Sequence, residues 1–347
     1  MSSVSITKKL LLIVVVAQLS GEPCYIDGLP NISTRPQCSS SGWVVSADFL
    51  GWYASQEVAS IYADVVTHFG VIPASWGAPS FNFNWDYGFR IGAGYDLEYD
   101  QWDTSLSWSW FRTDAKHTIP MNPNASIGPE FFAALLSFSL EGDTVLDVAQ
   151  SMSARWSLLF NMFDWELGRS FWVSKGLSLR PFLGLKGGWI HQSIDAKYYN
   201  LAIDNISTPN LGSEHLKNNF WGVGPLGGVN TKWRARDFGS HFFDLFGDFS
   251  VAEMWGSWSC SDVYKSTIPS TSSVNTKNSS LGALTLRGFM GIGWDVDFRE
   301  NKSHFAAKLG YEMQIWFDQL RIATFQLQRL HNDLTLQGVT FNCRLDY

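Results

Sequence analysis

Apolar and polar residues alternate with a period of two in ten separate segments of this 347-residue chain. A period of two is typical of a β-strand with one apolar and one polar face. In the clearest segment, from Trp85 to Glu98, aromatic and aliphatic residues alternate with Asp, Gly, Arg and Glu. The last segment, from Val339 to Tyr347, runs to the end of the chain. The pattern therefore predicts an all-β protein of about ten antiparallel strands.

The connections between these segments alternate between short and long. Short connections fall at 99–101, 174–176, 236–239 and 300–302, and long ones at 54–84, 111–151, 198–217, 258–280 and 319–333. Outer-membrane β-barrels have short periplasmic turns and long extracellular loops. We therefore expect a transmembrane antiparallel barrel with both termini in the periplasm, its apolar strand faces turned to lipid and its polar faces to the lumen. The last strand closes this barrel through Val339, Phe341, Cys343, Leu345 and Tyr347.

Two features complicate this pattern. The alternation of the fourth segment breaks near Met162 and Phe163, as it would at a β-bulge. In the longest loop, residues 129–140 begin with proline and continue with apolar residues, which favours a short helix folded over or into the barrel. The alternative is two further strands, for a total of twelve.

Composition agrees with a barrel and excludes other classes. Charged residues make up 16% and aromatic residues 15% of the chain, but its mean hydropathy is only −0.06. No run approaches the roughly 20 apolar residues that a transmembrane helix needs. The net charge is −7 and basic residues form no cluster, so nucleic acid is not expected as a partner.

The N-terminus resembles a secretory signal. Lys8 and Lys9 precede an apolar run that ends near Leu19, and small residues follow at Ser20 and Gly21. We expect a cleaved signal peptide at 1–21, a periplasmic segment at 22–41 and the barrel at 42–347, in the bacterial outer membrane.

The four cysteines suit an exported chain. Cys24 and Cys38 lie before the first strand and could form a disulfide, whereas the expected topology places Cys260 and Cys343 too far apart to do so. Unpaired thiols are the simpler expectation. No cysteine or histidine spacing indicates a metal site, and we expect no cofactor.

Two blocks carry a resemblance to a known family. Residues 83–95 read FNWDYGFRIGAGY, and residues 154–169 read ARWSLLFNMFDWELGR and continue through 179–192. These blocks, together with the opening segment 42–53, resemble the Legionella and Chlamydia-like major outer membrane proteins, and the likeness covers about 42–347. The resemblance implies a pore-forming barrel of the outer membrane. It carries over no catalytic residues.

We therefore expect a porin-like protein for passive diffusion of ions and small solutes, in which charged residues on the polar strand faces set ion preference. The candidates are Asp86, Arg90, Asp96, Glu98, Arg155, Arg180, Lys186, Lys232, Asp244, Asp248, Arg287, Asp295, Lys308 and Glu312. The competing interpretation is that they form ion pairs that fill the lumen, because ten strands leave a narrow path at best.

A second function is a structural or adhesive surface protein whose barrel is only an anchor. No motif resembles a catalytic constellation, so we do not expect an enzyme. The expected partners are outer-membrane lipid and lipopolysaccharide, and the barrel-assembly machinery during insertion. A homo-oligomer is a further alternative.

Overall fold

The computed structural model describes most of the chain from residue 42 onward. The described ranges are 42–56, 63–67, 75–77, 81–97, 99–120, 130–133, 148–149, 151–174, 176–199, 202–203, 206–207, 211–237, 241–266, 271–298, 303–323 and 329–347. The expected signal peptide, the segment 22–41, Cys24 and Cys38 lie outside these residues. No helix within them is long and apolar enough to cross a membrane.

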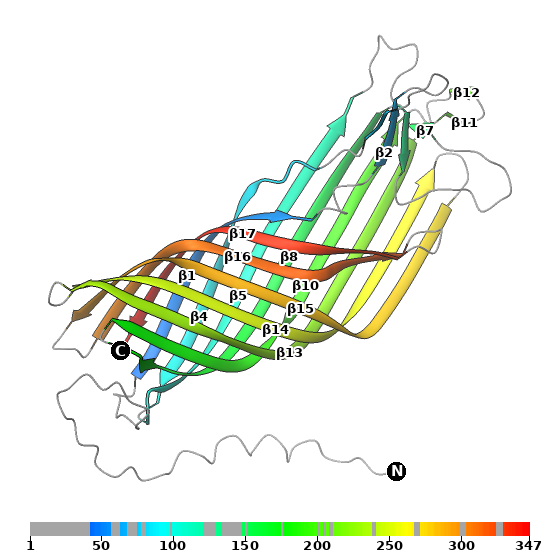
Figure 1. The fold of residues 1–347 in the computed structure, drawn as a ribbon. Coiled ribbons are helices and arrows are strands. Elements are labelled where there is room, and N and C mark those ends of the chain that lie inside the picture. The colour runs from blue at the N-terminus through cyan, green and yellow to red at the C-terminus, as the bar shows by residue number, and fades with distance from the viewer. Residues whose placement is uncertain are drawn as a thin grey trace, which may run out of the picture.

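Ten long antiparallel strands of the described chain form a closed barrel (Figure 1). In barrel order they are β1 (Gly42–Ser55), β4 (Trp85–Asp96), β5 (Trp102–Ile119), β8 (Ser151–Arg169), β10 (Leu177–Tyr199), β13 (Leu211–Asp237), β14 (His241–Ser266), β15 (Thr271–Phe298), β16 (Ser303–Ala323) and β17 (Arg329–Asp346). Each pairs with the next, and β17 pairs with β1 along twelve residues from Val44↔Asp346 to Ser55↔Thr335. The predicted barrel and its predicted closing strand are confirmed.

The beginning of β1 and the end of the chain meet at one end of the barrel. Trp43 and Tyr347 exchange two backbone hydrogen bonds of 2.8 and 2.9 Å. The turn from β4 to β5 lies at this same end, where Asp100 and Gln101 both have positive φ, 54° and 56°. That combination defines the type I′ turn, which suits a tight two-residue hairpin. We call this end the terminal end, and the opposite end the distal end.

At the distal end the strands are longer than predicted. Three of the five expected long loops, 198–217, 258–280 and 319–333, are largely β-structure, because β10, β13, β14, β15, β16 and β17 continue into them. The connection between β14 and β15 spans only residues 267–270. The prediction of long loops there was wrong, and the hairpins instead project beyond the rest of the barrel (Figure 1).

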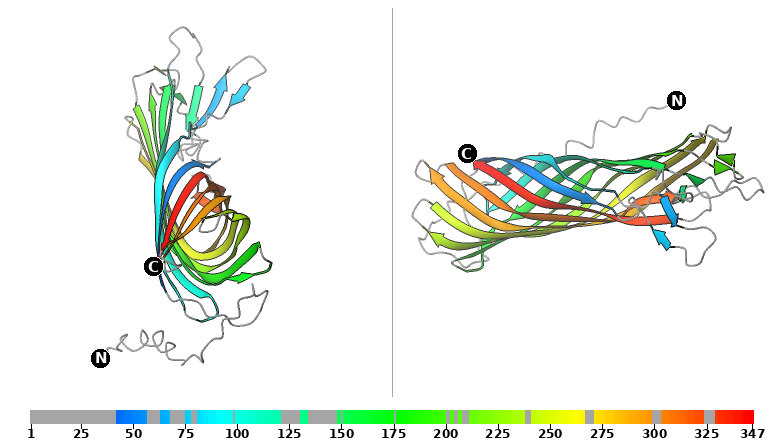
Figure 2. Two further views of the ribbon diagram at one scale, coloured as in Figure 1. Left: turned by 90° about the vertical axis from the view of Figure 1, so that its left-hand side faces the viewer. Right: turned by 90° about the horizontal axis from the view of Figure 1, so that it is seen from above.

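A second, smaller sheet lies at the distal end (Figure 2). Its strands are β2 (Ala63–Thr67), β3 (Ser75–Gly77), β6 (Glu130–Ala133), β7 (Val148–Ala149), β11 (Ala202–Ile203) and β12 (Ile206–Ser207). The predicted helix at 129–140 is wrong where it is described, because 130–133 is β6. Nor does β6 join the barrel as an eleventh strand. The remaining short strand, β9 (Phe171–Trp172), pairs with the start of β10.

An apolar belt surrounds the terminal half of the barrel. On β10 it extends from Leu179 to Trp189, which at about 3.3 Å per residue and a tilt near 40° corresponds to roughly 25 Å. That is the height of the lipid-facing band of an outer-membrane barrel. Tryptophan and tyrosine mark the edges of the belt. They include Trp85, Trp110, Trp189, Trp221 and Trp255 toward the distal end and Trp43, Tyr95, Trp233, Trp294 and Tyr347 toward the terminal end.

Beyond the belt the polarity of the two strand faces is reversed: outward side chains become polar and inward ones apolar. On β10 the outward side chains change from Leu185 and Trp189 to His191, while the inward ones change from Lys186 to the fully buried Ile190. On β8 the same reversal occurs near Met162. The register of β8 with both neighbours is continuous there, so the predicted β-bulge is wrong. The break in alternation marks the edge of the belt, not an irregular backbone.

Candidate functional site

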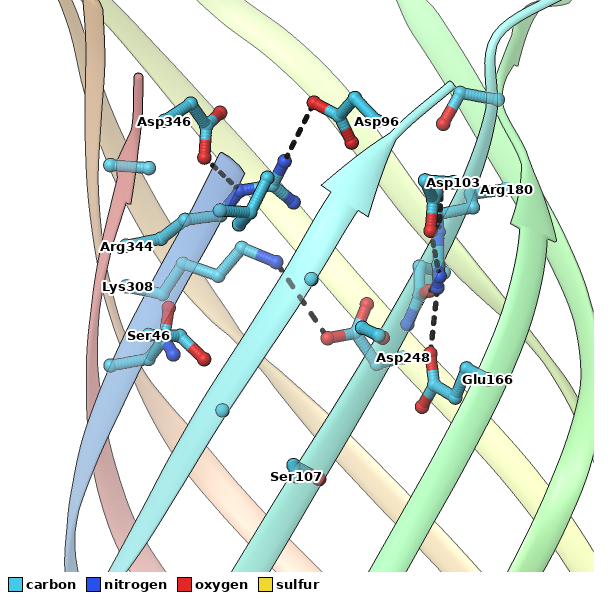
Figure 3. Close-up of a pocket in the computed structure, with 18 of the residues that line it drawn as sticks. Ser46, Asp96, Asp103, Ser107, Glu166, Arg180, Asp248, Lys308, Arg344 and Asp346 are labelled. Atoms are coloured by element: carbon cyan, nitrogen blue, oxygen red, sulfur yellow. Dashed lines mark hydrogen bonds and ion pairs between the residues drawn. The ribbon is translucent and has the colours of Figure 1, made fainter. Parts of the chain in front are cut away.

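The interior of the terminal half holds an open, charged cavity. Its volume is about 380 Å³, and its lining includes six acidic and four basic side chains. Figure 3 shows these side chains converging from opposite sides of the barrel. Arg344 lies 3.8 Å from Asp96, and Lys308 lies 3.8 Å from Asp248. Because acidic residues are in excess, the cavity, which we call the terminal cavity, carries a net negative charge at neutral pH.

One side of the terminal cavity is organised by Arg180 of β10. Its guanidinium donates to Asp103 at 2.5 and 2.8 Å and to Glu166 at 2.8 Å (Figure 3). A fourth hydrogen bond, of 2.7 Å, reaches the side chain of Asn230. The five donors of a guanidinium suit such multiple contacts. Arg180 therefore joins strands β5, β8, β10 and β13 and fixes the lining of the cavity on that side.

A buried ion cluster lies deeper in the interior than the terminal cavity. Arg90 donates to Asp48 at 2.7 Å and to Glu312 at 2.8 Å, and Arg287 donates to Glu312 at 2.7 Å. Glu312 is completely buried and also accepts from Thr340 at 3.0 Å. We call Asp48, Arg90, Arg287 and Glu312 the central ion cluster. The separate buried pair of Lys186 and Asp164, at 2.7 Å, lies in the same inner face.

Large aromatic side chains close the interior directly beyond this cluster. We call Trp52, Phe111, Phe160 and Trp316 the aromatic layer; all four are at most 1% exposed. Ring centroids lie 5.5 Å apart for Trp52 and Phe111 and 5.4 Å apart for Phe160 and Trp316. The layer touches the charges beneath it, since the guanidinium of Arg90 lies 5.8 Å from the Trp52 ring. Lys186 Nζ lies 5.6 Å from the Trp316 ring.

The structure turns most of the predicted pore-lining residues inward. Twelve of the fourteen face the interior. Eleven of them belong to the terminal cavity, the central ion cluster or the ion pairs beside them, and Asp86 accepts a hydrogen bond from Thr113 near the distal edge of the belt. The twelve are Asp86, Arg90, Asp96, Arg180, Lys186, Lys232, Asp244, Asp248, Arg287, Asp295, Lys308 and Glu312. Lys232 ion-pairs with both Asp244 and Asp295. Glu98 lies outside the described residues.

The prediction that Arg155 lines the lumen was wrong. This residue lies on β8 beyond the belt, where the inward positions are the buried Ala154 and Trp156. Arg155 therefore faces out of the barrel, where it pairs with Asp114 at 3.3 Å. The assignment failed because we took the apolar face of that segment to be the lipid face, which is true only within the belt.

Sequence reasoning missed several partners of these charges. Asp48, Asp103, Asp164 and Glu166 each make a short ion pair in the interior but were not among the candidates. All four occupy the polar face of a strand, so the alternation was a usable signal. The alternation does not show which strands face one another across the lumen. That arrangement determines which charged side chains form ion pairs.

A pair of carboxyl groups lies in the distal interior, beyond the belt. Glu214 of β13 and Asp262 of β14 are adjacent and at most 3% exposed, and Tyr198 donates to Glu214 at 2.6 Å. Burial and the neighbouring Asp262 raise the pKa of Glu214 well above its usual range. Burial also raises the pKa of Asp262, to about 6. At neutral pH one proton is therefore retained by this pair.

This pair predicts a pH-dependent stability. A raised carboxyl pKa means that the folded state binds protons more tightly than the unfolded one, so the contribution of this pair to stability is fully present below about pH 4 and is lost as the pH rises through 6. We expect Glu214→Gln to remove much of this loss and to raise the free energy of unfolding at pH 8 above that of the wild type, because it removes one of the two adjacent buried carboxyl groups. Urea unfolding between pH 4 and 8 measures it. Asp195→Asn, at an exposed outer position of β10, is the control, and equal slopes in all three proteins would contradict the prediction.

No group of three or more His, Cys, Asp or Glu side chains suited to a metal ion occurs in the described part of the chain. The described interior consists of an open cavity with a charged lining, a buried ion cluster and a layer of buried aromatic side chains.

Comparison with known proteins identifies the family. The family model of the Legionella pneumophila major outer membrane protein precursor matches residues 34–347, far more than half of the chain. The chain belongs to this family. The resemblance seen in residues 83–95 and 154–192 is thereby confirmed, and a place in the outer membrane follows from family and fold together.

Solved structures show a more distant likeness. The outer membrane protease OmpT from Escherichia coli is 9% identical, with 91% of this chain and 99% of that chain covered and a TM-score of 0.36. The Pseudomonas putida toluene transporter TodX is 9% identical, with 88% and 89% covered and a TM-score of 0.24. A Pseudomonas aeruginosa FadL homologue is 8% identical, with 88% and 90% covered and a TM-score of 0.25. Likeness at these TM-scores carries no argument about this chain. None of the curated proteins matches it.

Proposed function

We propose that this outer-membrane barrel is a pore for passive diffusion of ions and small solutes, with a preference for cations. The observation that carries the proposal is the terminal cavity of about 380 Å³ inside the apolar belt. That volume holds on the order of ten or more water molecules. A barrel that served only as an anchor has no need of a hydrated, charged chamber at the level of the lipid.

The terminal end is the periplasmic one in this proposal. The short β4–β5 turn and both ends of the barrel chain lie there, and periplasmic turns of outer-membrane barrels are short. The terminal cavity is then a periplasmic vestibule. Its excess of acidic side chains favours cations over anions. The aromatic layer is the part of the gate that borders the charged interior, and conduction requires displacement of this layer and of the apolar core that continues beyond it.

Planar-bilayer recording tests the proposal. Purified protein in a potassium chloride gradient is expected to give small conductance steps with a reversal potential shifted toward that of potassium. Replacing Asp96 and Asp248 with asparagine removes two negative charges from the terminal cavity and is expected to reduce this cation preference. Asp195→Asn, outside the barrel, is the matched control. Absence of steps at any protein concentration would exclude a pore.

The second candidate is a structural or adhesive surface protein anchored by the barrel. The observation that favours it is the distal half, where the strands enclose a large apolar core that includes Trp156, Trp258 and Phe220. That core supports a rigid projection beyond the membrane whether or not the interior conducts. The same recordings separate the two functions, and neither proposal assigns the chain a catalytic step or a cofactor.

A further inference from the structure

The ladder between β4 and β5 is interrupted just beyond the belt. The two strands pair from Asp96↔Asp103 to Gly88↔Phe111 and meet again only at the isolated bridge Asn82↔Lys116. Over the same length β5 stays paired with β8, so the interruption lies on one edge of β5 only. We call this interruption the β4–β5 seam; in Figure 1, β5 continues toward the distal end past the start of β4.

The seam forms a polar hollow in the wall of the barrel, with Asp86 on its inner side and Lys116 on its outer side. Its volume is about 530 Å³, and all five lining residues are polar: Asn82, Asn84, Asp86, Asp114 and Lys116. Asparagine amides donate and accept hydrogen bonds, and carboxylates accept them. This lining matches the hydroxyl groups of a sugar, each of which is both a donor and an acceptor.

Basic residues crowd the outer surface beside the hollow. Lys116 of β5 and Arg155 of β8 are directly opposite each other in register, and their side chains are 65% and 48% exposed. Like charges directly opposite on neighbouring strands destabilise a sheet. Asp114 lies within 3.3 Å of Arg155 and 3.8 Å of Lys116, so one carboxylate serves both cations. Arg112, also exposed, adds a third positive charge. Asp195 of β10 is directly opposite Arg155 in register, so three cations share two carboxylates on this surface and positive charge remains in excess.

The height of the seam is that of lipid headgroups. Trp85 and Trp110 mark the distal edge of the belt on β4 and β5. Arg112 is the next outward position after Trp110, and Lys116 the third. At 3.3 Å per residue and a tilt near 40° they lie roughly 5 and 15 Å beyond it. A ligand of the seam therefore has its apolar part beside the belt and its polar part at Lys116 and Arg155.

We propose that the β4–β5 seam binds the phosphorylated sugar headgroup of lipopolysaccharide. The phosphate neutralises Lys116, Arg155 and Arg112, the sugar hydroxyls bond the asparagine and carboxylate groups of the hollow, and the acyl chains lie along the belt below Trp110. This proposal depends on the orientation proposed above, in which the distal end is extracellular. It does not depend on whether the barrel conducts ions. Arginine and lysine are the usual partners of phosphate in proteins.

Binding of purified lipopolysaccharide to the full-length protein in detergent tests the site. Lys116→Ala with Arg155→Ala is expected to weaken binding at least tenfold. The matched control is Lys197→Ala with Lys217→Ala, which removes two exposed lysines from the outer faces of β10 and β13, and is expected to change binding less than twofold. Because the first pair relieves a like-charge contact, that variant is expected to fold, and its heat-dependent gel mobility checks this.

Three further ligands test which chemical groups of lipopolysaccharide the seam recognises. Enzymatically dephosphorylated lipopolysaccharide and phosphatidylglycerol are each expected to bind at least tenfold more weakly, the first for lack of phosphate and the second for lack of sugar. Inorganic phosphate at millimolar concentration is expected not to displace the lipid. Equal loss in both alanine pairs, tight binding of either comparison lipid, or displacement by phosphate alone would overturn the assignment. Failure of the conductance experiment would leave it standing, because the three cations that bind the phosphate, Arg112, Lys116 and Arg155, face out of the barrel.

Discussion

Replacing Glu312 with glutamine is expected to lower the free energy of unfolding by about 3–5 kcal/mol, the cost of breaking a buried ion pair by removing one partner. Glu312 is completely buried and accepts from Arg90 at 2.8 Å and Arg287 at 2.7 Å. The glutamine keeps the size of the side chain but leaves two guanidinium groups with Asp48 as their remaining close carboxylate. Urea unfolding of the purified barrel, followed by tryptophan fluorescence, measures the loss.

The control is Asp195→Asn, which also removes one carboxylate but lies on the outer face of β10 and pairs there with His215. Exposed ion pairs contribute little, so a change below about 1 kcal/mol is expected. The double variant Glu312→Gln with Arg287→Gln is expected to lose less than the sum of its single variants, because each removes the other's partner. If Glu312→Gln unfolds like the wild type, the central ion cluster does not hold the barrel together.

The ten strands could be predicted because lipid imposes a strict rule within the belt. Outward positions such as Phe89 and Leu183 must be apolar, while inward positions such as Arg90 and Lys186 are free to be charged. This rule is local, since every second residue of one strand records it. The position of the terminal strand followed from the same local pattern, since the alternation from Val339 to Tyr347 is unbroken.

The distal extensions could not be predicted because the rule reverses beyond the belt. On β14, the outward Ser257, Ser259 and Ser261 face away from the interior, whereas Trp258 and Cys260 are buried. A segment rich in serine, threonine and asparagine has the composition of a loop, and we interpreted 258–280 as one. Only the pairing with β13 and β15, which is long-range, shows that it is strand. Arg155 was assigned to the wrong face for the same reason.

The candidate site, too, could be predicted only in part from the sequence. That Arg90, Arg287 and Glu312 face the interior follows from alternation on three separate strands. That they meet in one cluster depends on the curvature of the closed barrel, which brings β4 opposite β15 and β16. The aromatic layer was missed because Trp52, Phe160 and Trp316 look like lipid-facing residues in the sequence, and nothing local distinguishes a tryptophan that faces lipid from one that faces a lumen.

Removing one member of the aromatic layer is expected to increase conduction, because it removes the largest obstacle next to the charged interior. Trp316→Ala deletes a fully buried ring that lies 5.4 Å from Phe160 and 5.6 Å from Lys186 Nζ. A cavity beside a charged group fills with water, whereas an apolar one stays dry. The cavity left by Trp316 would therefore extend the hydrated path beyond the central ion cluster, and single-channel conductance is expected to rise several-fold.

The matched control is Trp255→Ala, which removes the same side chain from the lipid face at the edge of the belt and is expected to leave conductance unchanged. A buried tryptophan-to-alanine change costs about 3–5 kcal/mol, so Trp316→Leu provides a smaller cavity in a more stable barrel and is expected to give an intermediate conductance. If folded Trp316→Ala conducts no better than the wild type, the aromatic layer is a structural core. The barrel is then the anchor of a surface protein, because the terminal cavity would end at a layer that does not open.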